Sequence, residues 1–412
     1  MSDRSGGLWV FKNSNGRGGA YRSLRINTSR DRSSFSEFPM PRDYPDYPGH
    51  ELVARYFDDY ARHFELAPHI RFRTRVVRVR PHGRAFDVEL ESGTCERYDA
   101  VIVANGHHFA PSFPPSVPGV FSGESLHAGA YVDPREPLEL ASKRVVVVGF
   151  GNSAVDIASE LAKAGSKVVL SVRRGSWVLP RYVFGRPLDQ ASASSSFFGW
   201  LPTSLRRRLV RLWYERTLGP PERLGLPRPD HEIGDAHPTV SDELLPLLTS
   251  GRITAKPAIA RFEGAHVHFT DSTHLPADAI VYATGYRVVF PFFDPEFISA
   301  PNNELPLFLR MIHPARPGIY FVGLCQPLGP LFPLAEAQSA MIAAHLSGEY
   351  VAPSAEEMAR AARDEREAVR RRFGSSPRHT MQLDFDAYLE ALGRERAAGQ
   401  RRARASLGSL TP

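Results

Sequence analysis

Three runs of apolar residues along this chain end close to a glycine, and each predicts a buried strand followed by a tight turn. They are Ala100–Ala104 before Asn105-Gly106, Arg144–Val148 before Gly149, and Ala279–Ala283 before Thr284-Gly285. Continuous rather than alternating apolar runs are typical of parallel strands that helices cover on both faces. The first and third runs also follow hairpin-like β segments, so the pattern indicates a repeated α/β unit.

Helical spacing and alternation place the other elements that matter for the layout. The segment Tyr21–Pro48 is rich in Ser, Pro and aromatic residues and predicts a structured loop. The segment Asp189–Asp235 lacks clear strands and predicts a lid, an insertion or a mobile stretch. The predicted helices are Glu51–His63, Ala154–Ala164 and Leu334–Leu346. Two further predicted strands, Ile70–Val79 and Phe86–Glu91, are joined by a turn at His82-Gly83 into a hairpin, and a third predicted strand is Ser166–Val172.

The positions of the two similar strand–glycine units predict how the chain is divided. They bracket the central run at Arg144–Val148, which suggests one domain inserted within a related one. We predict an α/β fold with two nested Rossmann-like dinucleotide-binding domains and boundaries near Tyr131 and Tyr286. Residues 1–131 and 287–412 would form the first domain, N-terminally incomplete, and residues 132–286 the inserted second.

The segment Gly149-Phe150-Gly151-Asn152-Ser153-Ala154 lies between a predicted strand and a predicted helix, as a dinucleotide-binding turn does. Its glycines permit a tight bend and close approach of a pyrophosphate, which the helix N-terminus attracts. The next strand ends in Arg173-Arg174 rather than Asp or Glu, which favours a 2′-phosphate and therefore NADPH. The predicted NADPH site comprises Gly149, Gly151, Asn152, Ser153, Ala154, Arg173 and Arg174, although one arginine can instead pair with a surface acid. A glycine turn in an unrelated α/β unit is the alternative.

Composition narrows the class of protein. The 412 residues, 42% hydrophobic and 23% charged, are typical of a soluble globular protein that is long enough for two domains. No run reaches the roughly 18 apolar residues of a membrane span, and the N-terminus lacks the apolar core of a signal peptide. With only Cys95 and Cys325 present, we predict a reducing, cytoplasmic setting and two buried thiols, with a single Cys95–Cys325 bond as the alternative.

The net charge of +6 arises from 51 basic and 45 acidic residues, with much of the excess in local arginine clusters. Acids and bases alternate at helical spacing over Glu356–Arg372, which predicts a solvated helix with internal ion pairs. No recognition motif accompanies the charge, so we predict no nucleic-acid partner. We predict no metal site, because His107-His108 are adjacent and lack the spacing of metal ligands.

Several segments together resemble the flavin-containing monooxygenase family. Residues Phe121 to Tyr131 carry Phe-x-Gly-x-x-x-His-x-x-x-Tyr, the pattern that identifies this family, just before the nucleotide motif. The segment Ala283-Thr284-Gly285-Tyr286 resembles the second linker motif of the family. The other similar segments, in the order of the family, are Gly6-Gly7-Leu8-Trp9, Asn27-Thr28-Ser29, Phe38-Pro39-Met40-Pro41 and Asn105-Gly106-His107-His108, so the resemblance covers essentially the whole chain.

This resemblance implies a monooxygenase that depends on NADPH and FAD. In the family, NADPH reduces FAD, and the reduced flavin takes up O₂ as a C4a-hydroperoxide. One oxygen atom then passes to a soft nucleophile, an amine nitrogen or a sulfide sulfur. The alternatives are a Baeyer–Villiger oxygenase and a non-catalytic NADP(H)-binding relative impaired in FAD binding. The implied partners are O₂ and a small nucleophilic substrate, with a homodimer left open as the assembly.

The resemblance also implies the residues of the flavin site. Asn27 matches the family asparagine near the reactive flavin carbon, where its neutral amide can donate a hydrogen bond to oxygen or to NADP⁺. A local Asx cap is the interpretation that the residues alone favour. His127 and Tyr131 are expected to hold the linker between the domains. The remaining implied cofactor-binding residues are Gly7, Leu8, Trp9, Thr28, Val77, Asn105, Gly106, Ala283, Thr284, Gly285, Gln326, Pro327 and Gly329.

The chain departs from the family pattern at its N-terminus. The family opens with a strand, a Gly-x-Gly-x-x-Gly turn, a helix and a second strand that ends in Glu, whereas this chain begins after that strand. The glycines of Gly16-Arg17-Gly18-Gly19 do not replace the turn, because no apolar strand precedes them. We expect the true start to lie upstream, and we expect the chain as written to hold FAD poorly yet to bind NADPH.

Overall fold

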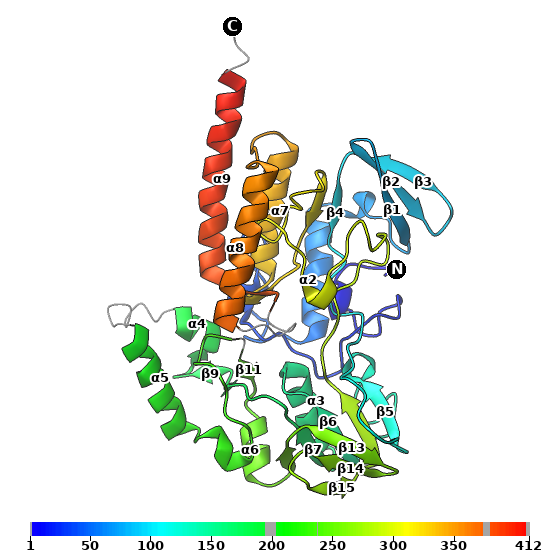
Figure 1. The fold of residues 1–412 in the computed structure, drawn as a ribbon, viewed down its shortest axis with the longest axis vertical. Helices are drawn as coiled ribbons and strands as arrows, with labels where there is room; N and C mark the ends of the chain where they lie inside the picture. Colours follow the sequence, from blue (N-terminus) through cyan, green and yellow to red (C-terminus); the bar gives the residue numbers. More distant parts are fainter. Residues whose placement is uncertain (1, 194–202, 237, 374–379, 409–412) are drawn as a thin grey trace.

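The chain folds into an α/β structure whose largest sheet is parallel (Figure 1). The computed structural model describes residues 2–193, 203–236, 238–373 and 380–408. The five-stranded sheet has the order β12-β7-β6-β16-β5, and all of its neighbouring strands run parallel. Its members are β5 (Glu124–His127), β6 (Arg144–Val148), β7 (Lys167–Ser171), β12 (Ile253–Lys256) and β16 (Ala279–Tyr282).

The order of these strands is that of a doubly wound, dinucleotide-binding sheet. Counted along the chain from β6, the strands β12, β7, β6 and β16 lie in the spatial order 3-2-1-4, which is typical of a doubly wound sheet. The predicted α/β fold class is therefore confirmed. The edge strand β5 comes from the chain before Tyr131, so the segment preceding that residue completes this sheet.

Helix α3 (Asn152–Lys163) follows β6 directly and starts two residues before the predicted helix. Its apolar side chains recur every three to four residues and form one buried face on the sheet, since Val155, Ile157 and Leu161 are all 0% exposed. Burying each such side chain contributes roughly 1.5–3 kcal/mol. This packing fixes the start of α3, and with it the glycine turn, against β6.

Two three-stranded antiparallel sheets repeat the pattern seen in the sequence. The strands β1 (Val76–His82), β2 (Ala85–Leu90) and β3 (Cys95–Tyr98) precede β4 (Val101–Val103), and β13 (Ile259–Glu263), β14 (His266–Phe269) and β15 (His274–Pro276) precede β16. The predicted hairpin is confirmed, but the predicted start of its first strand at Ile70 is wrong. Strand β1 begins at Val76 because its partner β2 ends opposite that residue, at Leu90.

The rest of the chain contains two smaller parallel sheets of two strands each. Strand β4 pairs with β17 (Ile319–Phe321), and β18 (Gln326–Leu328) pairs with β19 (Gln382–Asp384). Helices α7 (Phe332–Leu346), α8 (Ala355–Phe373) and α9 (Phe385–Gly408) lie at the end of the molecule opposite the five-stranded sheet (Figure 1). Helix α2 (His50–His63), α7 and α8 confirm the helices predicted in these regions.

Short elements connect these parts. The predicted loop Tyr21–Pro48 contains only the one-turn helix α1 (Arg30–Ser33). The region predicted as a lid or insertion includes the helix α5 and a 3₁₀ turn, with residues 194–202 outside the described part of the chain. The remaining elements are η1 (Gly7–Trp9), η2 (Ala67–His69), η3 (Ala128–Ala130), β8 (Val178–Leu179), β9 (Tyr182–Val183), β10 (Arg186–Pro187), α4 (Leu188–Ala193), α5 (Thr203–Thr217), η5 (Pro221–Leu224), β11 (Thr239–Val240), α6 (Leu244–Thr249) and η6 (Pro301–Asn303).

The two cysteines differ in their surroundings. Cys325 is buried, as predicted, and burial raises the pKa of its thiol to about 12. The prediction for Cys95 is wrong, because this residue lies exposed on the outer strand β3 of a three-stranded sheet. Within the described ranges, no helix combines the length and the apolar character that crossing a membrane would require.

Candidate functional site

The glycine turn and the second linker motif meet at the point where the strand order of the large sheet reverses. Strands β6 and β16 are neighbours, and the Ala283 N–H donates a hydrogen bond to the Val148 carbonyl at 2.9 Å. Gly149 has φ +130°, and a Cβ built on it would lie 2.3 Å from the Ala283 carbonyl oxygen. Only glycine fits there, and open α/β sheets bind ligands at this position.

The turn is braced from outside by the short strand β11. The Thr239 hydroxyl donates to the Phe150 carbonyl at 2.8 Å, and the Val240 N–H donates to Asn152 Oδ1 at 2.9 Å. The carbonyl oxygen of Asn152 therefore serves the protein framework, and its amide N–H groups are the part of this side chain suited to a ligand. This brace could not be predicted from the sequence, because no local pattern links residues that are about 90 positions apart.

Arg173 and Arg174 follow the carboxyl end of β7, and both are exposed. Their surroundings differ. The pKa of Asp230 is lowered, chiefly by a hydrogen bond from His231, and the charge of Arg174 contributes to the same shift. Arg174 therefore acts on an acid of the protein as well as being available to a nucleotide phosphate.

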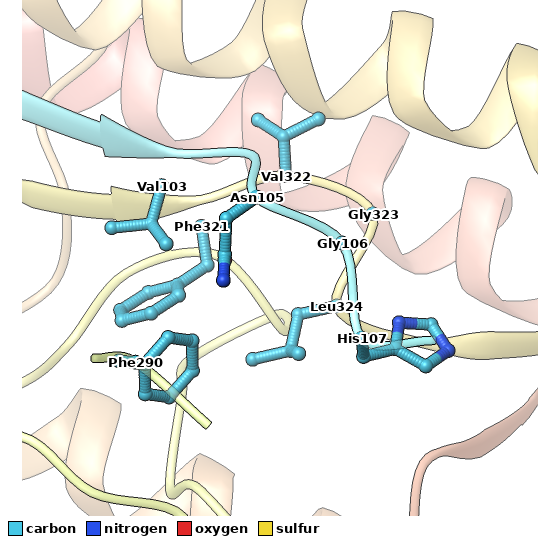
Figure 2. A pocket seen from close by; sticks show the side chains of 9 residues that line it. All are labelled: Val103, Asn105, Gly106, His107, Phe290, Phe321, Val322, Gly323 and Leu324. Carbon is cyan, nitrogen blue, oxygen red and sulfur yellow. The ribbon is translucent and has the colours of Figure 1, made fainter. Parts of the chain in front are cut away.

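A second cluster of predicted residues lies at the carboxyl ends of β4 and β17 (Figure 2). A small pocket that is partly open to solvent lies there, lined by both strand ends and by Phe290. The Asn105 side chain points toward Phe321 and Phe290, and the ring of His107 points away (Figure 2). Asn105 Nδ2 donates to the Val289 carbonyl at 3.3 Å.

The N-terminal residues pack beside this region. Trp9 of η1 meets Phe332 of α7 edge to face, with 6.3 Å between ring centroids, in the same apolar cluster as Ile26. A Cβ built on Gly19 would have Leu8 and Tyr286 as its nearest neighbours. The segments that carry Gly7–Trp9, Asn27 and the second linker motif are therefore close in space.

Asn27 follows Ile26 of this apolar cluster and has an unusual environment. Its Oδ1 atom is buried and has no hydrogen-bond partner among the described residues. The neighbouring Thr28 hydroxyl lies 2.6 Å from the Ser33 hydroxyl, so that side chain is used locally. An unpartnered buried carbonyl oxygen costs about 1–3 kcal/mol, which a donor on a bound molecule would recover.

The other predicted flavin-side residues lie on two strands. Val77 is half-buried on β1, and Gln326, Pro327 and Gly329 lie on or directly after β18. The Gln326 N–H donates to the Met381 carbonyl at 2.8 Å, which joins the start of β18 to the residue before β19. Gly329 has φ +154°, and a Cβ there would lie 2.8 Å from that of Phe385.

His127 and the two linkers form a brace. The Gly129 N–H donates to His127 Nδ1 at 3.1 Å, so the ring proton is on Nε2, which donates to the Gly285 carbonyl at 3.0 Å. Burial lowers the pKa of His127, and the bond to Gly285 opposes that shift. The Tyr131 hydroxyl donates to Glu160 Oε2 at 2.8 Å. These contacts hold the linkers and leave His127 neutral at pH 7.

These residues fit two nucleotide cofactors. Gly106, Gly285 and Gly323 have φ between +69° and +84°, and a Cβ on any of them would meet nothing within 4 Å. Such open glycine turns at strand ends let a cofactor approach the backbone closely, and the buried Asn27 oxygen supplies an acceptor. Over the ranges that the structure covers, no group of three or more His, Cys, Asp or Glu side chains is arranged to hold a metal ion.

Sequence comparison identifies the relatives of the chain. Residues 1–400 match the family model described as flavin-binding monooxygenase-like. The chain is 34% identical over 410 residues to dimethylaniline monooxygenase [N-oxide-forming] 2 of Rattus norvegicus, covering 95% of this chain and 76% of the relative. It is 33% identical over 412 residues to flavin-containing monooxygenase 5 of Homo sapiens, with the same coverage of 95% and 76%.

Solved structures share the fold at lower identity. S-allyl-L-cysteine S-oxygenase from Allium sativum superposes with a TM-score of 0.69 at 23% identity, covering 99% of this chain and 86% of its own. Cyclohexanone monooxygenase in its open form gives a TM-score of 0.70 at 16% identity, covering 97% and 92%. An oxidized steroid monooxygenase bound to NADP gives 0.69 at 16% identity over the same shares. At these identities the likeness concerns the fold.

Proposed function

Because the chain belongs to the flavin-binding monooxygenase-like family, we propose that it oxygenates small soft nucleophiles at an amine nitrogen or a sulfide sulfur. It is a flavin-dependent monooxygenase that uses FAD and NADPH. The relatives of more than 30% identity include an N-oxide-forming enzyme, which favours heteroatom oxygenation over attack on a ketone. The likeness to cyclohexanone monooxygenase is one of fold alone.

We propose the following division of the chain. Residues 132–286, completed by strand β5, bind NADPH, and residues 1–131 with 287–412 bind FAD. The pyrophosphate of NADPH lies at the glycine turn Gly149–Gly151 and the start of α3, and Arg173 with Arg174 contacts the 2′-phosphate. The two free cysteines support a cytoplasmic location as part of the same proposal.

The observation that carries the proposal is the buried Oδ1 of Asn27, which has no hydrogen-bond partner in the described part of the chain and follows Ile26 of the apolar cluster with Trp9 and Phe332. Bound FAD supplies the redox chemistry and the activation of O₂. The amide of Asn27 provides both an acceptor and donors at fixed positions, and it has no acidic proton to compete with substrate. The apolar cluster that contains the neighbouring Ile26 would help to exclude water, which favours oxygen transfer over release of hydrogen peroxide.

Replacing Asn27 with Ala tests this role in flavin-loaded enzyme. NADPH should still be oxidised, because the nucleotide turn is untouched. Formation of N-oxide or sulfoxide should fall by about 10²-fold, the usual effect of removing one aligned polar group from a reacting centre, and hydrogen peroxide should replace the product. N,N-dimethylaniline, methyl phenyl sulfide and cyclohexanone serve as the amine, sulfide and ketone substrates.

Asn15→Ala is the matched control. Asn15 is an asparagine of the same N-terminal region, but its Oδ1 already accepts the Arg17 N–H at 2.8 Å in a local turn. This variant should keep the product-to-peroxide ratio of the unmodified enzyme. An unchanged ratio in Asn27→Ala would remove Asn27 from the reacting centre, and oxygenation of cyclohexanone alone would replace the proposed reaction by the Baeyer–Villiger type.

A further inference from the structure

The segment that carries Asn27 is held at both ends by carboxylates of helices α3 and α4. Both helices belong to residues 132–286, the proposed NADPH-binding part, which is called the nucleotide side below. At one end, the Tyr21 hydroxyl donates to Asp156 Oδ2 on α3 at 2.6 Å. At the other end, the Ser29 N–H and hydroxyl both donate to Asp189 Oδ2 on α4, at 2.7 Å and 3.0 Å. Asn27 lies between these two attachments along the chain.

Both attachments are shielded from water. Tyr21 is 3% exposed and Ser29 is 1% exposed. Burial raises the pKa of both Tyr21 and Asp156, and Arg181 Nη2, 3.9 Å from Asp156 Oδ1, opposes the shift of the acid. Hydrogen bonds to carboxylates in such surroundings are stronger than neutral ones in water. The three bonds are therefore able to fix the position of the segment.

Helix α3 joins the first attachment to the nucleotide turn. Asp156 lies about one helical turn after Gly151 and Asn152, where the NADPH pyrophosphate is proposed to bind. Val155 and Ile157, on either side of Asp156, are completely buried against the sheet. The helix therefore moves as one body with the glycine turn, and any displacement of the turn reaches Tyr21 through one hydrogen bond.

We propose that Asp156 and Asp189 are positioning residues that set the place of Asn27 relative to bound NADPH. This inference rests on the proposed function, because it concerns how tightly NADPH oxidation is coupled to oxygen transfer. A reacting group displaced by about 1 Å can lose two orders of magnitude in rate. Because both ends of the segment 21–29 are attached to the nucleotide side, Asn27 keeps its position relative to bound NADPH when that side moves.

One other contact between the same parts of the chain, an exposed ion pair, lies outside the segment that carries Asn27. Lys12 Nζ lies 2.6 Å from Glu136 Oε1, and both side chains are about half exposed. This ion pair also joins the N-terminal region to the chain after the first linker. Because an exposed pair contributes little, Glu136→Gln should behave like the unmodified protein and is the matched control.

Hydrogen exchange tests the coupling without flavin. In the full chain, NADP⁺ should slow exchange of the backbone amides of residues 22–30, although the nucleotide binds at the glycine turn. Tyr21→Phe removes a single hydroxyl and keeps the ring. It should speed exchange of this segment by about fivefold and abolish the protection by NADP⁺, while Glu136→Gln should do neither.

Coupling measured in flavin-loaded enzyme completes the test. Tyr21→Phe and Asp189→Ala should each raise the fraction of NADPH oxidation that ends as hydrogen peroxide by at least about threefold, with the KM for NADPH changed by less than about twofold. Asp189→Glu should restore part of the coupling, which a purely structural role would not require. If Asp189→Ala fails to fold, Tyr21→Phe decides the question.

The two proposals fail in different ways. An unmodified enzyme that oxidises neither amine nor sulfide contradicts the proposed function, whatever the exchange data show. Equal exchange and equal peroxide fractions in Tyr21→Phe and Glu136→Gln overturn the positioning role, even if oxygenation is normal. The absence of NADP⁺-dependent protection of residues 22–30 in the unmodified chain overturns it as well.

Discussion

Replacing Gly149 with Ala perturbs the point where the nucleotide turn meets the second linker motif. Two physical costs apply. The backbone has φ +130°, a region that residues with a Cβ rarely adopt, and such strain costs about 1–3 kcal/mol. The new Cβ would also lie 2.3 Å from the Ala283 carbonyl oxygen. Ala283 directly follows β16, and its N–H is hydrogen-bonded to the Val148 carbonyl of β6, so its backbone is held in place. Relieving the clash therefore costs roughly 1–3 kcal/mol more.

Gly251→Ala separates the two costs. Gly251 has φ +72° at the end of α6, and a Cβ there would meet nothing within 4 Å. It should lose only the cost of backbone strain, about 1–2 kcal/mol, whereas Gly149→Ala should lose about 2–6 kcal/mol in total. The fall in melting temperature per kcal/mol shrinks with chain length and is about 1 °C for a chain of 412 residues. The melting temperature should therefore fall by about 1–2 °C in the control and about 2–6 °C in Gly149→Ala.

Calorimetry of unfolding and titration with NADP⁺ check this prediction together. The control should bind NADP⁺ with unchanged affinity, because α6 ends away from the glycine turn. Gly149→Ala should bind it at least about tenfold more weakly, since the displaced turn can no longer follow the pyrophosphate. Equal losses of melting temperature in the two variants, together with unchanged affinity in both, would refute the close contact between Gly149 and Ala283.

The remaining predictions concern charge. The double change Arg173→Ala and Arg174→Ala should reduce the ratio of the affinities for NADPH and NADH by about one to two orders of magnitude, because a charge-assisted phosphate contact contributes roughly 1.5–3 kcal/mol. Equal affinities of the unmodified chain for both nucleotides would contradict the assignment. Arg144 lowers the pKa of Asp278 to about 2 from its usual 3.8, so this pair stabilises the fold above about pH 4 and the benefit is lost as the pH falls through 2. Since both side chains are about one-third exposed or more, Asp278→Asn should cost only about 1 kcal/mol at pH 7 and almost nothing near pH 2, as denaturant unfolding at the two pH values would show.

The nucleotide half of the fold could be predicted from the sequence because its signals are local. Five residues from Arg144 to Val148, a glycine turn and an apolar helical period specify β6, the turn and α3 without reference to the rest of the chain. The start of β1 could not be predicted in this way. Ile70 and Val76 both belong to an apparently alternating run, but the strand extends only as far as β2 is long enough to pair with it.

The limits are similar in the candidate site. The resemblance to a family picked out Asn27, yet the contacts that hold its segment join residues about 135 to 160 positions apart. No periodicity reports such pairs, because a side-chain hydrogen bond requires one compatible group on each partner and no repeating pattern. The brace of Thr239 and Val240 on the nucleotide turn escaped prediction for the same reason.

One sequence signal, which the predictions above did not use, was available for the buried contacts of α3. The helix is largely apolar or small in its side chains, and Asp156 and Glu160 stand four residues apart on one side of it. Acids in a helix that packs on a sheet need partners, since burying an unpaired carboxylate is costly. The structure supplies Tyr21 to the first acid and Tyr131 to the second. The spacing of the two acids therefore predicts that hydrogen-bond donors from other parts of the chain contact α3. Only the tertiary fold decides that these donors are the hydroxyls of Tyr21 and Tyr131.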